Sequence, residues 1–176
     1  MVEMEQDNAG HMFIYEKLGI SFSEGQLIDL YQNKGRFLYK YAGSLMEEIT
    51  LLCFKEKYPE ACKTKIENIV GTKPKNFEID CLIGTEAYEI KWRDATTDGD
   101  HINKEHMRIS NIVAHGLTPV RLMFYQPNRS QAIKIQSKLK SLYHSVGGRY
   151  YSGVDAWNHL EEKTTVDLLN LLEKIQ

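Results

Sequence analysis

The sequence predicts an α/β fold, in which a small group of strands is combined with helices along one chain. Two apolar-rich runs, 77–83 and 87–92, flank a turn that contains Gly84, and this pattern is typical of a β-hairpin. Residues 118–125 read Thr-Pro-Val-Arg-Leu-Met-Phe-Tyr and are followed by Pro127, which favours a buried strand. Segments with apolar residues at helical spacing precede, separate and follow these strands.

Capping residues support the expected helices in addition to their apolar spacing. Ser23 and Gln26 match a capping box, and the helix that they open is expected to end near Gly35. Asp100 can cap a helix that Gly116 terminates. The remaining predictions are a helix over about 36–57, an edge strand over 66–70, a helix that begins at Ser130, a turn with exposed tyrosines over 147–153, and a final helix capped by Thr164 or Thr165.

Length and composition predict a single domain spanning residues 1–176, with residues 1–12 loosely held. No apolar run approaches the length of a membrane span, and the polar N-terminus lacks a signal-peptide pattern. We therefore expect no membrane partner and a cytoplasmic location. Cys53, Cys62 and Cys81 are odd in number and share no CxxC spacing, which fits reduced, buried thiols and disfavours a zinc site.

The formal net charge of -2 argues against a surface that binds DNA everywhere, but the charges are unevenly distributed. Residues 107–154 contain no Asp or Glu, so this segment is locally basic. Its basic residues are Arg108, Arg121, Arg129, Lys134, Lys138, Lys140 and Arg149. The segment can be a solvated basic face or a face that binds DNA.

The predicted hairpin carries a group of residues with a specific chemistry. Glu89 and Lys91 lie two residues apart, so an extended chain points both side chains to one face, while Ile90 points into the core. Pairing across the short turn can bring the Asp80 carboxylate close to Glu89. Two carboxylates and a main-chain carbonyl suit Mg²⁺, and an adjacent lysine can orient an attacking water. The alternative is an exposed hairpin whose acids and lysine form its solvent face.

Asp80 and, nine positions later, Glu89-Ile-Lys91 resemble the PD-(D/E)xK phosphodiesterase motif of many restriction endonucleases. The longer run Glu-Ile-Lys-Trp-Arg-Asp-Ala-Thr-Thr-Asp-Gly-Asp-His-Ile over 89–102, followed by Lys-Glu-His over 104–106, is more closely similar to ApaLI-type type II restriction endonucleases. This resemblance covers roughly residues 78–109. Two features depart from it: Ile79 replaces the proline before the first acid, and a chain of 176 residues leaves little room for extra recognition domains.

The resemblance implies an α/β core in which a small mixed β-sheet is flanked by helices. It also implies a type II restriction endonuclease that cleaves double-stranded DNA at a short palindrome as a homodimer and leaves 5′-phosphate ends. Mg²⁺ would be the cofactor, and Mn²⁺ would substitute for it. Asp80, Glu89 and the Ile90 carbonyl would bind the metal, and Lys91 would position the water.

In this superfamily the helix before the sheet often supplies one more acid to the metal site, and Glu48 is the candidate, with Glu47 next to it. Glu48 falls on the same side of its predicted helix as Tyr41, Leu45 and Leu52. That is an awkward position for an acid unless a partner or a metal receives it. The alternative is a glutamate that points to solvent.

The candidates for contact with DNA combine the loop after the hairpin, the helix that follows it and the basic segment. Arginine suits the guanine edge, and acids can accept a hydrogen bond from cytosine. The helix over 101–115 is expected to expose Lys104, Arg108 and Asn111. The full set of candidates is Arg93, Asp94, Asp98, Asp100, His101, Lys104, Arg108, Lys134 and Lys138.

Three other functions compete with this interpretation. A structure-specific nuclease of the same superfamily, such as a junction resolvase or a repair nicking enzyme, would share the chemistry but not the sequence specificity. A DNA-binding module could have kept the fold and lost catalysis, although Asp80, Glu89 and Lys91 are all present. The third alternative is a protein that binds an unrelated ligand.

Overall fold

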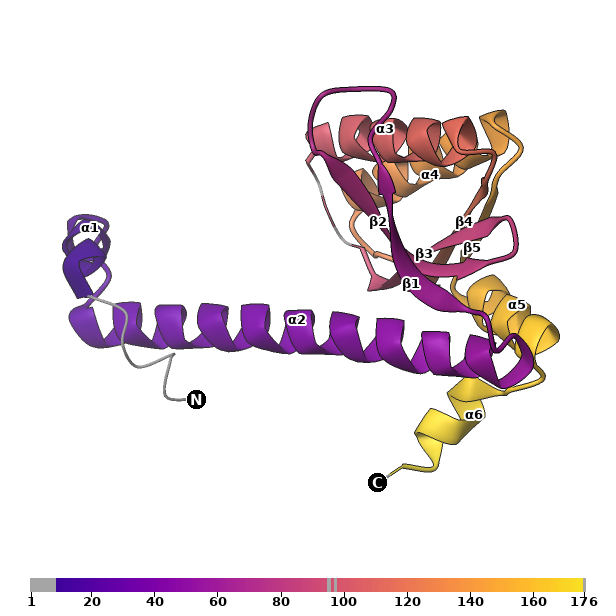
Figure 1. Cartoon of the computed structure of the whole chain (residues 1–176). Helices are drawn as coiled ribbons and strands as arrows, with labels where there is room; N and C mark the ends of the chain where they lie inside the picture. Colours follow the sequence, from indigo (N-terminus) through magenta and orange to yellow (C-terminus); the bar gives the residue numbers. More distant parts are fainter. Residues whose placement is uncertain (1–8, 95, 97, 176) are drawn as a thin grey trace. The chain divides into compact units, whose positions relative to one another are not determined.

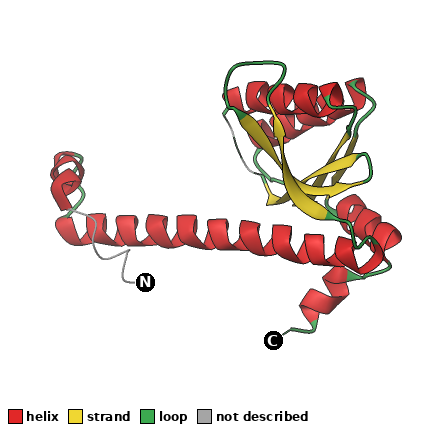
Figure 2. Ribbon diagram, in the orientation of Figure 1, coloured by secondary structure: helices red, strands yellow, loops and turns green. Residues whose placement is uncertain are grey.

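The structure is a computed structural model that describes residues 9–94, 96 and 98–175. It divides into two compact units, Met1–Ser44 and Leu45–Gln176 (Figures 1 and 2). Residues 1–8 of the segment expected to be loosely held, 1–12, lie outside the described residues. Residues 9–12 are helical. The expectation of a single domain stays a prediction.

The first unit contains a 3-10 turn, Ala9–His11, helix α1, Met12–Lys17, and the beginning of helix α2, Phe22–Lys57. Asp29 of α2 accepts a hydrogen bond from the Tyr15 hydroxyl at 2.9 Å and pairs with His11. The glycine at position 25 allows α1 to approach α2, because a Cβ atom there would lie 2.8 Å from the Tyr15 ring.

Helix α2 differs from the two helices expected over 23–57, because it continues without a break through Gly35. A single helical glycine costs only about 1 kcal/mol relative to alanine, and long helical segments on both sides compensate for this. The capping box also lies two residues earlier than expected. The Ser21 amide donates to Glu24 Oε2 at 2.9 Å, and the Glu24 amide donates to Ser21 Oγ at 3.3 Å.

The second unit is built on a five-stranded sheet in the order β1-β2-β3-β4-β5. The first three strands are antiparallel, and β4 and β5 are added in parallel to β3. The strands are β1, Cys62–Glu67, β2, Asn76–Ile83, β3, Glu86–Arg93, β4, Thr118–Tyr125, and β5, Arg149–Ser152. The predicted mixed sheet, the hairpin and the strand over 118–125 are therefore confirmed.

Helices cover both faces of this sheet. Helix α3, Asp100–Ala114, and helix α4, Ser130–Ser145, lie over one face, and helix α5, Val154–Thr164, lies against the other (Figure 1). Because side chains alternate along a strand, Ile90 and Leu122 belong to the core that contains α5, while Met123 packs with α3 and α4. A short helix α6, Leu168–Glu173, closes the chain, and Asp167 caps it by accepting from the Asn170 amide at 3.0 Å.

Three local predictions are corrected by tertiary contacts. The segment expected to expose tyrosines forms β5, and buried Tyr150 donates a hydrogen bond to Gln136 Oε1 at 2.7 Å. The edge strand lies over Cys62–Glu67 instead of 66–70. Asn111, expected on the exposed side of α3, is fully buried because its Oδ1 accepts hydrogen bonds from the amides of Ile69 and Val70.

All three cysteines are free, as expected, but Cys62 is exposed, whereas Cys53 and Cys81 are buried. Cys62 begins the edge strand β1, where its side chain meets solvent. Within the described residues, no helix combines the length and the apolar character that crossing a bilayer requires.

We predict that Gly148→Ala destabilises the second unit, because a Cβ atom there would lie 2.7 Å from the Pro119 carbonyl oxygen and 2.9 Å from that of Tyr143. Overpacking of this kind typically costs about 1–3 kcal/mol. The free energy of unfolding in urea, followed by tryptophan fluorescence, measures the loss. Gly99→Ala is the control, since nothing lies within 4 Å of its Cβ position. Equal stability of the two variants would contradict the prediction.

Candidate active site

An irregularity in the pairing of β1 with β2 places Asp80 near Lys91 of β3. Thr64 of β1 pairs with Ile79, but Cys62 pairs with Leu82, so β2 uses one residue more than β1 over this interval. Bulges of this kind change the face of the sheet to which a side chain points. Asp80 and Ile79, although adjacent, therefore both contribute to the face that α3 covers.

Asp80, Glu89 and Lys91 meet where β2 and β3 separate. The pairing of the two strands ends at Cys81 and Tyr88, and one residue further the Asp80 carboxylate takes the place of a main-chain partner. Its Oδ2 accepts a hydrogen bond from the Ile90 amide at 2.8 Å. Lys91 Nζ lies 2.7 Å from Glu89 Oε1 and 3.8 Å from Asp80 Oδ2.

Both carboxylates are buried, with 6% of Asp80 and 3% of Glu89 exposed. Arg108 of α3 pairs with Glu89 Oε2, so Glu89 is bound by two cations at once. The Nε of Arg108 also lies 3.6 Å from Glu105 Oε1. Burying a carboxylate is costly unless it is paired in this way.

A second group of buried charges adjoins the first, because Glu105 contacts both Arg108 and Arg121. It is centred on Arg121 of β4, which is fully buried. Its Nη2 lies 2.6 Å from Asp94 Oδ2, and its Nη1 lies 3.2 Å from Glu105 Oε2. The Tyr143 hydroxyl donates to Glu105 Oε1 at 3.4 Å. Arg121 thus connects β4 to α3 and to the end of β3.

The pKa of Asp94 shows how strongly this network favours ionised groups. Burial alone would raise the pKa of the Asp94 carboxyl, but the contact with His101, whose Nε2 lies 3.1 Å away, and the charge of Arg121 hold it well below its ordinary value. Because the folded-state pKa is depressed, Asp94 stabilises the fold above about pH 4, the ordinary pKa of aspartate, and this stabilisation is lost as the pH falls further.

The structure does not place Glu48 beside Asp80 and Glu89, because Glu48 is exposed on α2. Glu47 is oriented toward the sheet: Lys63 of β1 lies 3.4 Å from Glu47 Oε2 and 2.8 Å from Glu78 Oε1. The alternative noted for Glu48, a side chain that points to solvent, describes its position.

The candidates for DNA contact fall into two groups. Asp94, His101 and Arg108 are engaged in the buried network described above. The others are exposed: Asp100 and Lys104 pair with each other at 2.9 Å, and Asp98 accepts from the Asp100 amide at 3.0 Å. Arg93, Lys134 and Lys138 are likewise on the surface.

The basic segment is less basic at the surface than its composition suggests. Arg108 and Arg121 are paired within the buried network, and Arg149 pairs with Glu86. Burial alone would raise the pKa of Glu86, but hydrogen bonds from Arg149, Tyr88 and Lys163 lower it to about 2. The segment's exposed cations are Arg129, Lys134, Lys138 and Lys140.

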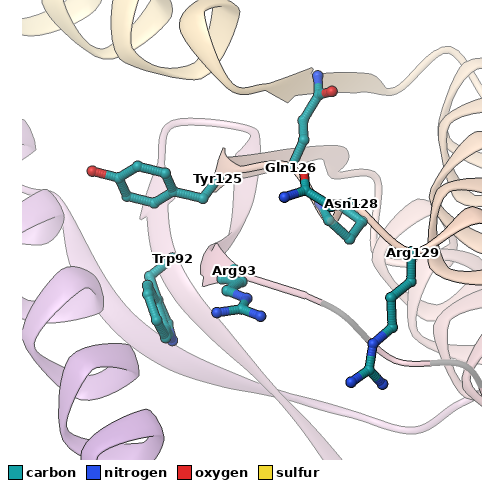
Figure 3. A pocket seen from close by; sticks show the side chains of 7 residues that line it. Trp92, Arg93, Tyr125, Gln126, Asn128 and Arg129 are labelled. Carbon is teal, nitrogen blue, oxygen red and sulfur yellow. The ribbon is translucent and has the colours of Figure 1, made fainter.

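An open pocket of about 390 Å³ lies at the carboxyl ends of β3 and β4. Trp92 and Tyr125 contribute aromatic rings whose centroids are 6.4 Å apart, and two arginines, Arg93 and Arg129, point into the same space (Figure 3). The rest of the lining comes from Gln126, Pro127 and Asn128. The carboxyl ends of parallel strands are a common place for ligands in α/β proteins.

The donor set at Asp80 and Glu89 suits a hard divalent cation. The amide and carbonyl of one strand residue point to the same side, so the Ile90 carbonyl also faces the Asp80 side of β3. In the described part of the chain, no three His, Cys, Asp or Glu side chains are grouped to hold a metal. Mg²⁺ usually takes one or two carboxylates and fills its other positions with water and phosphate oxygens.

The ApaLI-like restriction endonuclease family model matches residues 1–176, the whole chain. The chain belongs to this family. The resemblance seen over residues 78–109 is therefore confirmed, and an ApaLI-like restriction endonuclease is a nuclease whose substrate is DNA. Neither the curated proteins nor the solved structures include a match.

Sequence analysis did not identify Glu105 and Arg121 as parts of this ApaLI-like site. A signal was present for Arg121, since it is the one charged residue in the apolar run over 118–125 and a buried charge requires a partner. Glu105 gave no comparable signal, because on α3 it precedes Arg108 by three residues, a spacing that is common on exposed helices.

We predict that Arg121→Met lowers the free energy of unfolding of this endonuclease by about 3–5 kcal/mol, because Asp94 and Glu105 would remain buried without their cation. Urea unfolding at neutral pH measures the change. The control is Arg129→Met, an exposed arginine for which we expect a change within about 0.5 kcal/mol. Adding Asp94→Asn and Glu105→Gln to Arg121→Met should recover part of the loss. A cost below about 1 kcal/mol would show that water reaches these carboxylates.

Proposed function

We propose that this chain is a type II restriction endonuclease that cleaves double-stranded DNA within a short palindrome and leaves 5′-phosphate ends. The observation that carries the proposal is the meeting of Asp80, Glu89 and Lys91 at one point of the sheet, in a chain that belongs to a restriction endonuclease family. Free thiols at all three cysteines suit a cytoplasmic enzyme.

Asp80, Glu89 and the Ile90 carbonyl would hold Mg²⁺, or Mn²⁺ in its place. A divalent cation bound there supplies positive charge that polarises a water and stabilises the charge that develops on a phosphate. The hydrogen bond from the Ile90 amide fixes the Asp80 carboxylate in advance, so little reorganisation is needed when ligands arrive.

Arg108 is the residue that would give up its contact with Glu89 when a metal binds there. It pairs with Glu89 Oε2 in the structure, and Lys91 pairs with Oε1, so both carboxylate oxygens are neutralised. When a metal binds to Glu89, Arg108 would leave this carboxylate and contact a DNA phosphate, which is the kind of anion that a guanidinium binds well. This accounts for the dual character of Arg108 as a site residue and a DNA contact.

Lys91 would orient the attacking water and stabilise the transition state, because its ammonium lies between the two carboxylates. In the proposed hydrolysis the water oxygen forms a bond to phosphorus and the bond from phosphorus to O3′ breaks. One water proton finally reaches the O3′ leaving group, and the phosphate stays on the 5′ end. A single positioned group of this kind contributes about 10²-fold or more to the rate.

The pocket beside Arg93 supports a role in reading the DNA sequence. Arg93 lies two residues after Lys91 on β3, so it would face nucleotides close to the cleaved bond. Arg93 and Arg129 offer guanidinium groups, and Gln126 and Asn128 offer amides (Figure 3). These are the groups that discriminate guanine and adenine edges.

Exposed lysines outside the pocket would position the DNA without reading it. Lys134 and Lys138 on α4 are suited to phosphate contacts. Asp98 precedes α3, Asp100 and Lys104 lie in its first turns, and all three are exposed. The two acids would accept hydrogen bonds from cytosine. Asp94 and His101 would hold that loop in place through the buried network. A palindrome has two equivalent halves, so we propose a homodimer.

A digest of plasmid DNA in Mg²⁺ tests the function. Wild-type protein should give discrete fragments with 5′-phosphate ends, whereas Asp80→Asn and Glu89→Gln should reduce cleavage by about 10²-fold or more and remain folded. The control is Glu161→Gln, an exposed carboxylate on α5, which should cleave normally. Cleavage in excess EDTA would refute metal dependence. A continuous smear, or cutting only at branched DNA, would favour the structure-specific nuclease.

A salt titration of DNA binding in Ca²⁺ distinguishes the reader from the phosphate contacts. Arg93→Ala should cost roughly 1–3 kcal/mol on the recognition site and much less on random DNA. Lys138→Ala should weaken both DNAs alike and reduce the slope of log affinity against log salt by about 0.9. If Arg93→Ala weakens both DNAs equally, the pocket is not the reader. If Lys138→Ala keeps the wild-type slope, α4 does not face the DNA.

A further inference from the structure

The pocket at the ends of β3 and β4 differs in shape from a surface that reads DNA in a groove. Base pairs of a duplex are read by elements that protrude into the groove. This pocket is instead a hollow of about 390 Å³, near the lower end of the range for small-molecule sites, about 300–1,000 Å³. A hollow receives a group that protrudes from the DNA, and its size suits one nucleotide better than a length of duplex.

Tyr125 provides an aromatic ring that a base can reach. It exposes 48% of its surface at the end of β4, although its ring centroid lies 6.4 Å from that of Trp92 and 5.9 Å from that of Trp157. Both contacts are edge-on, with interplanar angles of 71° and 78°, and neither is a parallel stack. In a duplex each base face is covered by a neighbouring base pair, so an aromatic ring stacks only on a base that has left the helix.

The charged groups of the pocket suit a nucleotide. Of the 7 described residues that line it, Arg93 and Arg129 are cationic and none is acidic. The guanidinium carbon of Arg93 lies 5.9 Å from the centroid of the Trp92 ring, a cation–π contact that directs this long side chain. Tyr125 and Trp92 lie on one side of the pocket and Arg129 on the other, with Arg93 between them (Figure 3). The pocket therefore combines a stacking surface with groups that bind phosphate.

Two amides can recognise the edge of a base held there. Gln126 and Asn128 line the same pocket. The Gln126 amide nitrogen donates to Ser152 Oγ at 3.0 Å, which holds this side chain against β5. An amide presents a donor and an acceptor together, and this combination distinguishes one base edge from another. A single exposed tyrosine is ordinary at a protein surface, but Tyr125 is combined here with two guanidinium groups and two amides.

The order of residues along β3 puts the pocket next to the catalytic group. Trp92 and Arg93 directly follow Lys91, and Arg93 pairs with Tyr125 in the register of the sheet. One strand residue covers about 3.3 Å, which is close to the spacing of about 3.4 Å between nucleotides along one DNA strand. The pocket thus begins within about one or two nucleotides of the bond on which Lys91 would act.

We propose that this pocket binds one nucleotide of the DNA whose base has left the double helix. The base stacks on Tyr125, Arg93 and the two amides contact its edge, and Arg129 contacts its phosphate. Extruding a base costs the free energy of unpairing and unstacking, and the stack on Tyr125 offsets part of this cost. The inference rests on the proposed function for its ligand, DNA, and adds the form in which that ligand is bound.

Removal of the partner base tests the extrusion. On the recognition site found by the plasmid digest, an abasic site is placed opposite each base in turn, and the dissociation constant is measured in Ca²⁺ by fluorescence anisotropy. Opposite the extruded base, this change should strengthen binding about tenfold, because the protein no longer has to unpair the base. A base pair that is read in the groove should respond in the opposite direction, with binding about tenfold weaker. Weaker or unchanged binding at every position would overturn the proposal.

Substitutions of Tyr125 test the stacking. Tyr125→Leu keeps an apolar side chain but removes the ring, and it should weaken binding to the duplex that gains affinity about tenfold. Tyr125→Phe is the matched control, because it keeps the ring and removes only the hydroxyl, and it should bind as wild type does. Urea unfolding establishes that both variants are folded. If wild type, Tyr125→Leu and Tyr125→Phe bind this duplex equally, Tyr125 does not hold a base.

A short single-stranded oligodeoxynucleotide of mixed sequence separates failure of the pocket from failure of the nuclease, because its bases are unpaired and it needs no recognition site. In Ca²⁺, wild type should bind it about tenfold more tightly than the same sugar–phosphate backbone without bases, and Tyr125→Leu should remove this difference. Equal binding of the two strands by wild type would show that the pocket holds phosphate alone and would overturn the proposal.

Free deoxynucleoside monophosphates distinguish a nucleotide within a strand from a free one. They should displace the oligodeoxynucleotide only at much higher concentration than an unlabelled copy of it. Displacement at equal concentration would assign the pocket to a free nucleotide and overturn the proposal. A protein that binds the single strand as expected but does not cut DNA refutes the nuclease alone, and a nuclease that does not distinguish the two strands refutes the pocket alone.

Discussion

The buried guanidinium of Arg121 is the interaction on which the site depends. It lies between Asp94 at the end of β3 and Glu105 on α3, and Glu105 in turn lies beside Arg108, which pairs with Glu89. Through these contacts, β4 and α3 together hold Glu89, the carboxylate that would bind metal, in place. Buried ion pairs contribute little net stability, but breaking one without a replacement is costly, so Asp94, Arg121 and Glu105 are held in a single arrangement.

Much of the fold could be predicted from the sequence because the signals were local. The hairpin follows from two apolar runs around Gly84, and β4 was predicted with its observed bounds, Thr118–Tyr125. Glu89 and Lys91 share a face because strand geometry has a period of two. Asp80 reached the same place only with the help of a bulge, and nothing in the sequence announces a bulge at that point.

The features that could not be predicted depend on contacts between distant segments. Tyr150 looked exposed beside two glycines, but it is buried because β5 pairs with β4 and because Gln136 accepts its hydroxyl. Asn111 is buried by two amides more than 40 residues earlier in the chain. Three arginines counted as surface charge are neutralised by acids from outside the basic segment. Composition reports charges, but only the fold determines which of them reach solvent.

The buried pairing of Asp94 is separate from the exposed residues near it, and this separation has an evolutionary consequence. The Asp94 carboxylate is paired with the buried Arg121 guanidinium, so the loop that follows Asp94 begins at a fixed position. Asp98 and Gly99 of this loop, Asp100 at the start of α3, and Arg93 of the pocket are on the surface. Under the proposed function, substitutions there would alter the DNA sequence that is recognised, while Asp80, Glu89 and Lys91 are kept. Under that function, recognition could change within the family without a change in the buried network that supports the site.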